Sequence, residues 1–293
     1  MTVIPSDLPL AAEPRRSSRV WRQVRRHPTI VVGGLLLAVM AGMAIFAPYL
    51  GTTDPQALSP IRRLRWPSEQ YWFGTDMLGR DLYSRTVYGA RVSLTVGIMV
   101  ALFATALGLA IGLFAGFNRW VDAIVMRVMD GLMSIPAVLI AIALMALTRA
   151  SLQNVVFAIT VAEVPRVSRL VRGIVLTLRE QPFVEAAIAS GTGYVRIMWR
   201  HIVPNTVAPL LVQGTYIAAS AMITEAILSF LGAGTPPNIP SWGNIMAEGR
   251  SLFQVAYYIV LFPGLMLSIT VLAINLLGDG MRDALDPRLA RRM

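Results

Sequence analysis

Two carboxylates lie in or beside long apolar segments, where a carboxylate can carry a proton or line a solute pathway. Glu163 directly follows one apolar run, and Glu225 lies inside another. Ionisable residues at membrane depth are costly to bury and therefore usually have a function. The alternative is structural: each carboxylate pairs with an arginine or caps a break near a helix end. We favour the structural role and keep both residues as pathway candidates.

Other chemistry is largely excluded by residue type. The chain has no cysteine, which rules out disulfides, thiolate metal sites and cysteine nucleophiles. His27 and His201 are the only histidines, and neither has a partner at a metal-ligand spacing. The Gly-x-x-x-x-Gly-Lys-Ser/Thr loop that binds nucleotide phosphates is also absent. We predict no catalytic residue, no metal site and no cofactor in this chain, so any ATPase has to be a separate subunit.

An irregular loop follows the segment that Glu225 begins, and it is rich in proline, with Trp242 near its end. Non-helical backbone is tolerated at membrane depth only where it is buried in protein or lines a cavity. We therefore expect this loop to form the mouth of a pathway. The candidates for a pathway or gate are Glu163, Glu225, Ser229 and Trp242.

A polar segment at 179–204 separates two apolar segments and begins with the pattern of a short helix. Pro182 suits the first helical position, and Glu185 falls in the first turn, where the helix dipole favours a carboxylate. Gly191 and Gly193 are expected to stop this helix.

A second short helix is expected from about residue 194 to residue 202, where Pro204 ends it. Helical spacing would place Arg196 and Arg200 on one side. The other side would gather the apolar residues Tyr194, Val195, Met198, Trp199 and Ile202. Two short helices joined by a glycine hinge are suited to fit a groove in another protein. We interpret 179–204 as a docking element.

The composition is that of a membrane protein. Hydrophobic residues make up 55% of the 293 residues and charged residues only 14%, which is far from a soluble domain. The net charge of +10 is carried by arginine alone, because the chain has no lysine. The arginines lie at the ends of apolar segments, as orientation signals do, so we expect contact with a lipid bilayer and not with nucleic acid.

The apolar runs predict an all-α, polytopic membrane protein of about six transmembrane helices. The first run is longer than a usual signal-peptide core and no clear cleavage site follows it, so we interpret it as an uncleaved span. Pro136 is expected to kink the third span, and the fourth is expected to continue beyond the bilayer. The runs are at about 30–50, 92–117, 131–148, 150–162, 205–231 and 253–278.

This span count gives a topology with both termini in the cytoplasm. Arg62, Arg63 and Arg65 oppose it, because they lie in the first outer loop, but the orientation rule is a bias set by all loops together. The predicted parts are a tail at 1–28, a transmembrane domain at 29–278 with outer loops 51–90 and 232–252 and inner loop 179–204, and a tail at 279–293.

Three glycines at four-residue spacing form a stripe of small residues in the second span. Such a stripe lets two helices approach closely, so we assign it to helix packing. The residues are Gly108, Gly112 and Gly116.

The docking element resembles the cytoplasmic "EAA" loop of the permease subunits of ATP-binding-cassette importers. The resemblance rests on Glu185-Ala186-Ala187, on Gly191 and on Ile202-Val203-Pro204. It implies that this loop forms coupling helices that seat in a cleft of the ATPase subunit. The residues assigned to coupling are Glu185, Ala186, Ala187, Gly191, Arg196, Arg200, Ile202 and Pro204.

Further stretches resemble the C-type subunit of the dipeptide, oligopeptide and nickel branch of these permeases, over about residues 70–288. Val203 and Ala233 depart from it, each standing where leucine is common, but both keep an apolar residue. The stretches are Phe73-Gly74-Thr75-Asp76, Gly79-Arg80-Asp81, Tyr88-Gly89-Ala90-Arg91, Arg127 with Asp130 and Ile135-Pro136, His201 to Asn205, Glu225 to Gly232, Pro240-Ser241-Trp242-Gly243 and Asn275 to Gly280.

The resemblance implies a type I importer permease fold in the plasma (inner) membrane of a prokaryote. It also implies the partners: a second, homologous permease, two ATPase subunits that bind ATP and magnesium, and an extracytoplasmic substrate-binding protein. This chain would then be a permease subunit and not itself an enzyme. Two rival functions are a secondary transporter that uses Glu163 or Glu225 for coupling, and a membrane-anchored scaffold.

The family branch leaves peptide and nickel open as cargo, and the residue inventory favours peptide. A path for bare transition-metal ions is expected to offer imidazole or sulfur ligands, but the chain has no cysteine and only two histidines. Its 15 methionines are more typical of flexible packing than of metal binding. We expect di- or oligopeptides, with nickel or a metal chelate as the alternative.

Overall fold

The computed structural model describes residues 28–285, and the regular elements in this range are helices. An isolated bridge between Thr75 and Asp81 is the extent of β pairing there. The all-α prediction is therefore confirmed. Nearly all of the predicted tail at 1–28, and the end of the chain beyond 285, lie outside the described residues.

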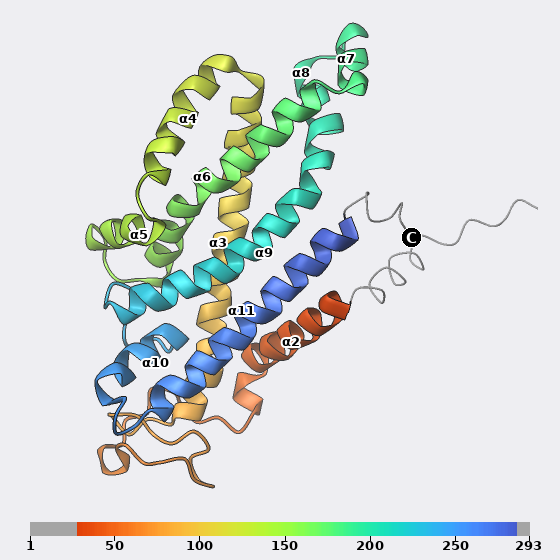
Figure 1. The fold of residues 1–293 in the computed structure, drawn as a ribbon. Helices are drawn as coiled ribbons and strands as arrows, with labels where there is room; N and C mark the ends of the chain where they lie inside the picture. Colours follow the sequence, from red (N-terminus) through yellow and green to blue (C-terminus); the bar gives the residue numbers. More distant parts are fainter. Residues whose placement is uncertain (1–27, 286–293) are drawn as a thin grey trace, which may run out of the picture.

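The long helices lie alongside one another and form an elongated bundle (Figure 1). One end holds the loop that follows α2, and the other holds the hairpin of α7 and α8. The helices are α2 (Pro28–Ile45), α3 (Leu82–Phe117), α4 (Arg119–Met133), α5 (Ala137–Ala146), α6 (Leu152–Arg179), α7 (Pro182–Ala189), α8 (Tyr194–Ile197), α9 (Val203–Phe230), α10 (Trp242–Gly249) and α11 (Tyr258–Leu285), with short 3-10 turns at 47–49, 60–62 and 250–252.

Helix α3 begins at Leu82, so the outer loop predicted at 51–90 ends eight to nine residues earlier than expected. Asp81 caps the helix, because its side chain accepts a hydrogen bond from the backbone N–H of Ser84. The predicted loop included Arg85, and Arg91 directly follows it. Both side chains are satisfied within the fold, Arg85 by carboxylates and Arg91 by the carbonyl oxygens at the end of α2.

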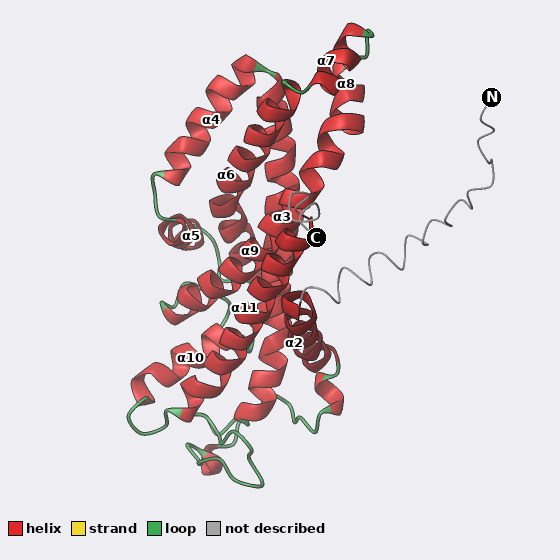
Figure 2. Cartoon of the chain, turned by 45° about the vertical axis from the view of Figure 1, so that its right-hand side comes forward, coloured by secondary structure: helices red, strands yellow, loops and turns green. Residues whose placement is uncertain are grey.

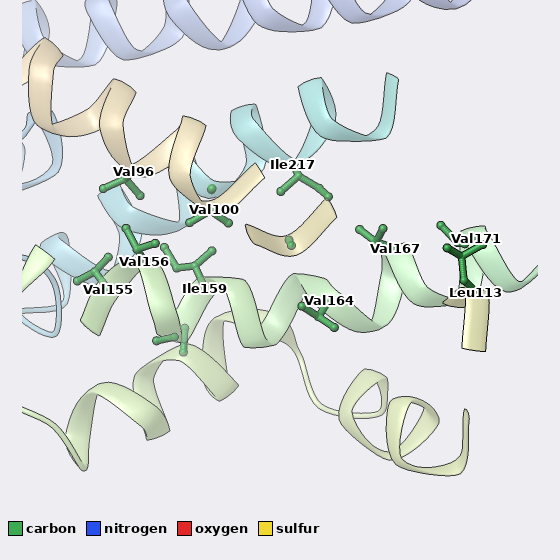
Figure 3. Packing of buried hydrophobic residues seen from close by; sticks show 14 of the residues in the cluster. Val96, Val100, Leu113, Val155, Val156, Ile159, Val164, Val167, Val171 and Ile217 are labelled. Atoms are coloured by element: carbon green, nitrogen blue, oxygen red, sulfur yellow. The ribbon is translucent and has the colours of Figure 1, made fainter. Parts of the chain in front are cut away.

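The glycine stripe of α3 lies against α6. A Cβ added to Gly112 would lie 2.6 Å from the Cβ of Val171, which is too close for any real contact. Gly108 and Gly116 face Val167 and Val175 in the same way. Figure 3 shows Val167 and Val171 inside the core formed by α3, α6 and α9, and Val175 belongs to the same cluster. The absence of a side chain at these glycines sets how closely the two helices approach.

Replacing Gly112 with leucine is expected to destabilise the protein by about 1–3 kcal/mol, because the added atoms would force the packed helices apart. The measurement is thermal unfolding of the purified protein in detergent. Gly173→Leu on α6 is the matched control, since a Cβ there meets no atom within 4 Å. Equal losses in the two variants would contradict the packing role.

The number of membrane spans differs from the prediction of about six. Among the described residues, four helical segments are long and apolar enough to cross a membrane: α2, α3, the continuous stretch Tyr194–Phe230, and α11. The pair α4 and α5 can form a fifth, although the two helices meet at 90°. Helix α6 has 28 residues but carries Glu163 and several arginines, so the six-span count is not confirmed.

The third span predicted at 131–148 is wrong in its bounds. Helix α4 already begins at Arg119, where the side chain of Asn118 accepts hydrogen bonds from two backbone N–H groups. Pro136 does not kink a continuous helix but lies in the break between α4 and α5. The residue before a proline is pushed out of the helical conformation, so a break is the expected result at this position.

Two further bounds differ from the predicted parts. Helix α11 continues past Gly278 to Leu285, so residues 279–285 are helical and not part of a tail. The outer loop at 232–252 contains α10, which lies near the end of the molecule that holds the loop after α2 (Figure 2). Ser241 caps α10 by accepting a hydrogen bond from the backbone N–H of Asn244.

Candidate functional site

The α7–α8 hairpin stands at one end of the molecule, beyond the bundle of long helices (Figures 1 and 2). Helix α7 begins at Pro182 and ends at Ala189, as the sequence predicts. Gly191 then has a φ of +78°, which glycine adopts without the steric cost that a side chain brings. The backbone N–H groups of Gly191 and Thr192 donate to Ile188 and Ala187, which closes the helix end.

A small core holds this hairpin to the rest of the protein. Val184 of α7, Ile197 of α8 and Ile202 are each at most 1% exposed. They belong to the same apolar cluster as Val175 of α6. Ile202, predicted as a coupling residue, is therefore enclosed and positions the hairpin from inside.

The outer surface of the hairpin is apolar and basic. Large apolar side chains from both helices are 44–70% exposed: Phe183, Ile188, Tyr194, Val195 and Trp199. The coupling candidates Glu185, Ala186, Gly191, Arg196 and Arg200 are exposed on the same hairpin, and Ala187 is half-buried. We call these exposed residues the hairpin surface.

The predicted single apolar side of the second helix is wrong. Tyr194, Val195 and Trp199 are exposed, whereas Ile202 is buried. The reason is a π-helical turn at Met198–Ile202, which inserts extra residues per turn and shifts the helical register. Ile197, which the prediction left out, is buried at the end of α8.

Pro204 does not end the second helix. Helix α8 continues through the π-helical turn into α9, so Tyr194–Phe230 forms one continuous helical stretch. Pro204 lies in the first turn of α9, where its missing N–H costs no hydrogen bond of that helix. The hairpin is thus directly continuous with a long apolar helix.

The hairpin also contacts the C-terminal end of α3. The guanidinium of Arg179 at the end of α6 donates to the carbonyl oxygen of Gly116 at 2.7 Å and lies over the ring of Phe117. Tyr194 meets the same Phe117 ring edge-on, with 6.4 Å between ring centroids. Helices α3, α6 and α8 therefore meet at one point beside the hairpin.

Glu163 lies buried in α6, close to an arginine of the same helix. The distance between its Oε2 and Nη1 of Arg166 is 3.2 Å, and Ser220 of α9 donates a hydrogen bond to its Oε1 at 3.3 Å. This is the pairing with arginine that the sequence interpretation favours over a free proton carrier. Glu163 is not grouped with the other pathway candidates.

Glu225 is fully buried and holds the junction between α9 and α10. Its Oε1 accepts hydrogen bonds from the hydroxyls of Ser229 and Ser241, both at 2.8 Å. Trp242 is also fully buried, and its indole N–H donates to the carbonyl oxygen of Thr86 in α3. Glu225, Ser229 and Trp242 are thus brought together, and they fasten α10 to α9 and α3.

The side-chain amide of Asn244 makes several of the hydrogen bonds that hold the irregular loop between α9 and α10. The side-chain NH2 of Asn244 donates to oxygen atoms of Thr235, Pro236 and Ile239. These bonds satisfy carbonyl groups that the loop leaves outside regular structure. The loop is thus a folded connection whose polar atoms face inward.

A buried cluster of four charges joins the first outer loop to α3 and α10. Asp76 and Arg85 are each 1% exposed in their side chains, and Arg80 is 9% exposed. Nε of Arg80 lies 2.6 Å from Asp76, and Nη1 of Arg85 lies 2.6 Å from Glu248 of α10. We call Asp76, Arg80, Arg85 and Glu248 the charge cluster.

Sequence reasoning missed the charge cluster. Asp76 and Arg80 were noted only as parts of a motif, and Glu248 was not singled out. Glu248 is 163 residues from Arg85 in the chain, so no local spacing connects the pair. The one local signal was the spacing of Asp76 and Arg80, two opposite charges four residues apart.

An apolar groove of about 620 Å³ runs between α2, α3, α9 and α11. Its lining includes Leu94, Gly97, Leu210, Gly214 and Met222, and neither Glu163 nor Glu225 is part of it.

Comparison with protein families gives two matches. Residues 108–291 match the family described as "Binding-protein-dependent transport system inner membrane component". Residues 16–67 match the "N-terminal TM domain of oligopeptide transport permease C". Together the two models cover most of the chain.

Similar curated proteins are named as permeases. A probable peptide ABC transporter permease protein of Sinorhizobium fredii is 50% identical, over 93% of this chain and 94% of that protein. A dipeptide transport system permease protein of Alkalihalophilus pseudofirmus is 41% identical, over 97% and 93%. A glutathione transport system permease protein of Pectobacterium atrosepticum is 40% identical, over 92% and 90%.

The fold also matches a solved structure. An inward-facing form of the MetNI methionine ABC transporter superposes with a TM-score of 0.56 and 20% identity, over 70% of this chain and 98% of that chain. At this identity the match concerns the fold alone, which is the type I importer permease fold expected from the sequence.

Proposed function

We propose a peptide cargo for this chain, which belongs to the family of binding-protein-dependent inner-membrane transport components and is a permease subunit of an ATP-binding-cassette importer. The chain is a multi-pass inner-membrane protein and not itself an enzyme. One observation carries the proposal. Over more than nine tenths of its length, the chain is 40–50% identical in sequence to permeases named for peptides, dipeptides and glutathione, which is a tripeptide.

The residue inventory supports peptides over bare nickel. A peptide has mixed chemistry and requires a path that holds no side chain tightly. The apolar groove between α2, α3, α9 and α11 has such walls, with Leu94, Leu210 and Met222 among its lining. Imidazole and thiolate, which transition metals favour, are nearly absent from the sequence.

The partners follow from the family and from the hairpin surface. The chain works with ATPase and substrate-binding subunits, and we propose that the path is completed by a second, homologous permease. The hairpin surface would seat on the ATPase, since exposed Phe, Tyr and Trp beside Arg196 and Arg200 are typical of protein interfaces. ATP and magnesium would then bind to the two ATPase subunits.

This docking role fixes the proposed orientation. The α7–α8 hairpin would lie in the cytoplasm, with both chain termini on the same side and the loop after α2 outside. A secondary transporter is disfavoured, because Glu163 is paired with Arg166 and Glu225 is bound by two serine hydroxyls. Neither carboxylate lines the apolar groove between α2, α3, α9 and α11.

Deletion of the gene is expected to abolish growth on a required amino acid that is supplied only as a short peptide. The measurement is growth of an auxotrophic strain on the di- or tripeptide, beside uptake of labelled nickel. Growth on the free amino acid is the control, and a plasmid copy of the gene should restore peptide use. Unchanged growth on peptide together with lost nickel uptake would overturn the peptide assignment.

A further inference from the structure

The loop that follows α2 is a folded element. The Thr75 hydroxyl accepts a hydrogen bond from the backbone N–H of Arg65 at 2.8 Å, and the N–H of Leu64 donates to the carbonyl oxygen of Asp76 at 3.1 Å. Gly74 and Gly79 both have positive φ, at +81° and +74°, which permits the tight turns of this loop. The two arms of the loop are thus bonded to each other.

The same loop is fixed to the helices at two places. The charge cluster bonds Asp76 and Arg80 to Arg85 of α3 and Glu248 of α10. Trp66 packs against the rings of Tyr257 and Tyr258, with centroids 5.7 and 5.5 Å apart. A surface on this loop is therefore held in one shape before any partner arrives, which lowers the entropic cost of binding.

The first part of this rigid loop exposes both apolar and basic side chains. Ile61 is 89% exposed and Leu58 is 64% exposed, and three exposed arginines accompany them. Within residues 28–285, no carboxylate forms an ion pair with these arginines. We call Leu58, Ile61, Arg62, Arg63 and Arg65 the outer basic face.

The outer basic face runs against the usual charge bias of a membrane protein. In the proposed orientation it lies outside, where arginines near a span disfavour the topology. Exposed apolar side chains beside arginines are compatible with a protein interface, because arginine is enriched at interfaces and complementary charge on the partner gives specificity. The face therefore fits a partner that supplies carboxylates around an apolar recess.

We propose that the outer basic face docks an acidic surface of the extracytoplasmic substrate-binding protein. The inference rests on the proposed function and adds the place and the charge of the contact. A protein partner is favoured over lipid headgroups because the loop extends past the ends of α3 and α11 (Figure 1). The charge cluster joins this face to α10. Docking would therefore act directly on α10, which begins at Trp242 and packs beside Glu225 of α9.

The test uses the assembled transporter in lipid nanodiscs and the binding protein that restores its peptide uptake. Combined Arg62→Glu, Arg63→Glu and Arg65→Glu changes are expected to weaken the binding protein's affinity about tenfold or more and to remove its salt dependence. Basal ATP hydrolysis should stay unchanged, since the contacts of these side chains lie within the loop: Arg62 lies over the Tyr71 ring and Arg63 donates to the carbonyl oxygen of Met77. The triple lysine variant should keep most of the affinity.

Arg149→Glu is the matched control, because this arginine is also exposed, in the connection between α5 and α6 and outside the outer basic face. The binding protein's affinity for the Arg149→Glu transporter should equal its affinity for the unchanged transporter. Should the triple variant fail to assemble, Arg65→Glu alone is measured, since no contact of its side chain holds the loop.

Two results would overturn the proposal. The first is that the binding protein binds the triple glutamate variant with an affinity within about twofold of that for the unchanged transporter, with peptide uptake intact. That result would exclude this face as the docking surface. Unchanged affinity with lost binding to phosphatidylglycerol vesicles would assign the face to the membrane instead. Failure of the proposed function is distinct, because the unchanged transporter would then show no uptake that depends on a binding protein.

Discussion

Replacing Arg85 with methionine is expected to remove most of the protein from the membrane. Arg85 is 1% exposed and bonds both Asp76 and Glu248, so its loss leaves two carboxylates with only Arg80 to neutralise them. Breaking a buried ion pair by removing one partner costs about 3–5 kcal/mol. Total stabilities of folded proteins are about 5–15 kcal/mol, so this one change takes a large share.

The measurements are the amount of protein in isolated membranes and the unfolding temperature in detergent. Arg63→Met is the matched control, because Arg63 is exposed and bonds only the carbonyl oxygen of Met77. A second variant that adds Asp76→Asn and Glu248→Gln to Arg85→Met should recover part of the loss, because it removes the uncompensated charges. Equal stability of Arg85→Met and Arg63→Met would show that the charge cluster does not support the fold.

The sequence predicted best those features that depend on neighbouring residues. Pro182 and Gly191 bound α7 as expected, because the missing N–H of proline and the positive φ of glycine act within one turn. The spacing of Gly108, Gly112 and Gly116 likewise pointed to close helix packing, and the structure sets them against α6. Local chemistry was sufficient in both cases.

Errors arose where a residue has a distant partner or where helical register changes. The outer loop predicted at 51–90 included Arg85, whose charge is satisfied by Glu248, which lies 163 residues away. Ile202 was given an exposed role because no residue type signals the π-helical turn that buries it. Charge near a span is therefore an unsafe sign of a loop when carboxylates occur elsewhere on the same side.

The docking element at 179–204 illustrates both outcomes. Its existence and its first helix followed from proline, glycine and the helix dipole. The division between its buried and exposed residues required the structure, because Val184, Ile197 and Ile202 form a core that only the folded hairpin creates. That division tells which side chains can reach an ATPase and which only shape the surface.

Replacing Gly191 with proline is expected to abolish ATP hydrolysis that depends on transport, while the protein remains in the membrane. Proline requires a φ near −65°, whereas Gly191 has +78°, and proline cannot donate the hydrogen bond that Gly191 gives to Ile188. The turn between α7 and α8 would be lost. Because the hairpin stands beyond the bundle (Figure 2), the long helices should still fold.

Glu185→Lys should have the same functional effect for a different reason. Glu185 is exposed in the first turn of α7, where a positive charge opposes the helix dipole by about 0.3–1 kcal/mol, too little to unfold the hairpin. Its effect on coupling would come from reversed charge at the contact with the ATPase. The control is Asp283→Lys, the same charge change at an exposed position of α11, which should leave coupling intact. The assay is peptide uptake and stimulated ATP hydrolysis in the reconstituted transporter, and full activity in both hairpin variants would refute the docking role.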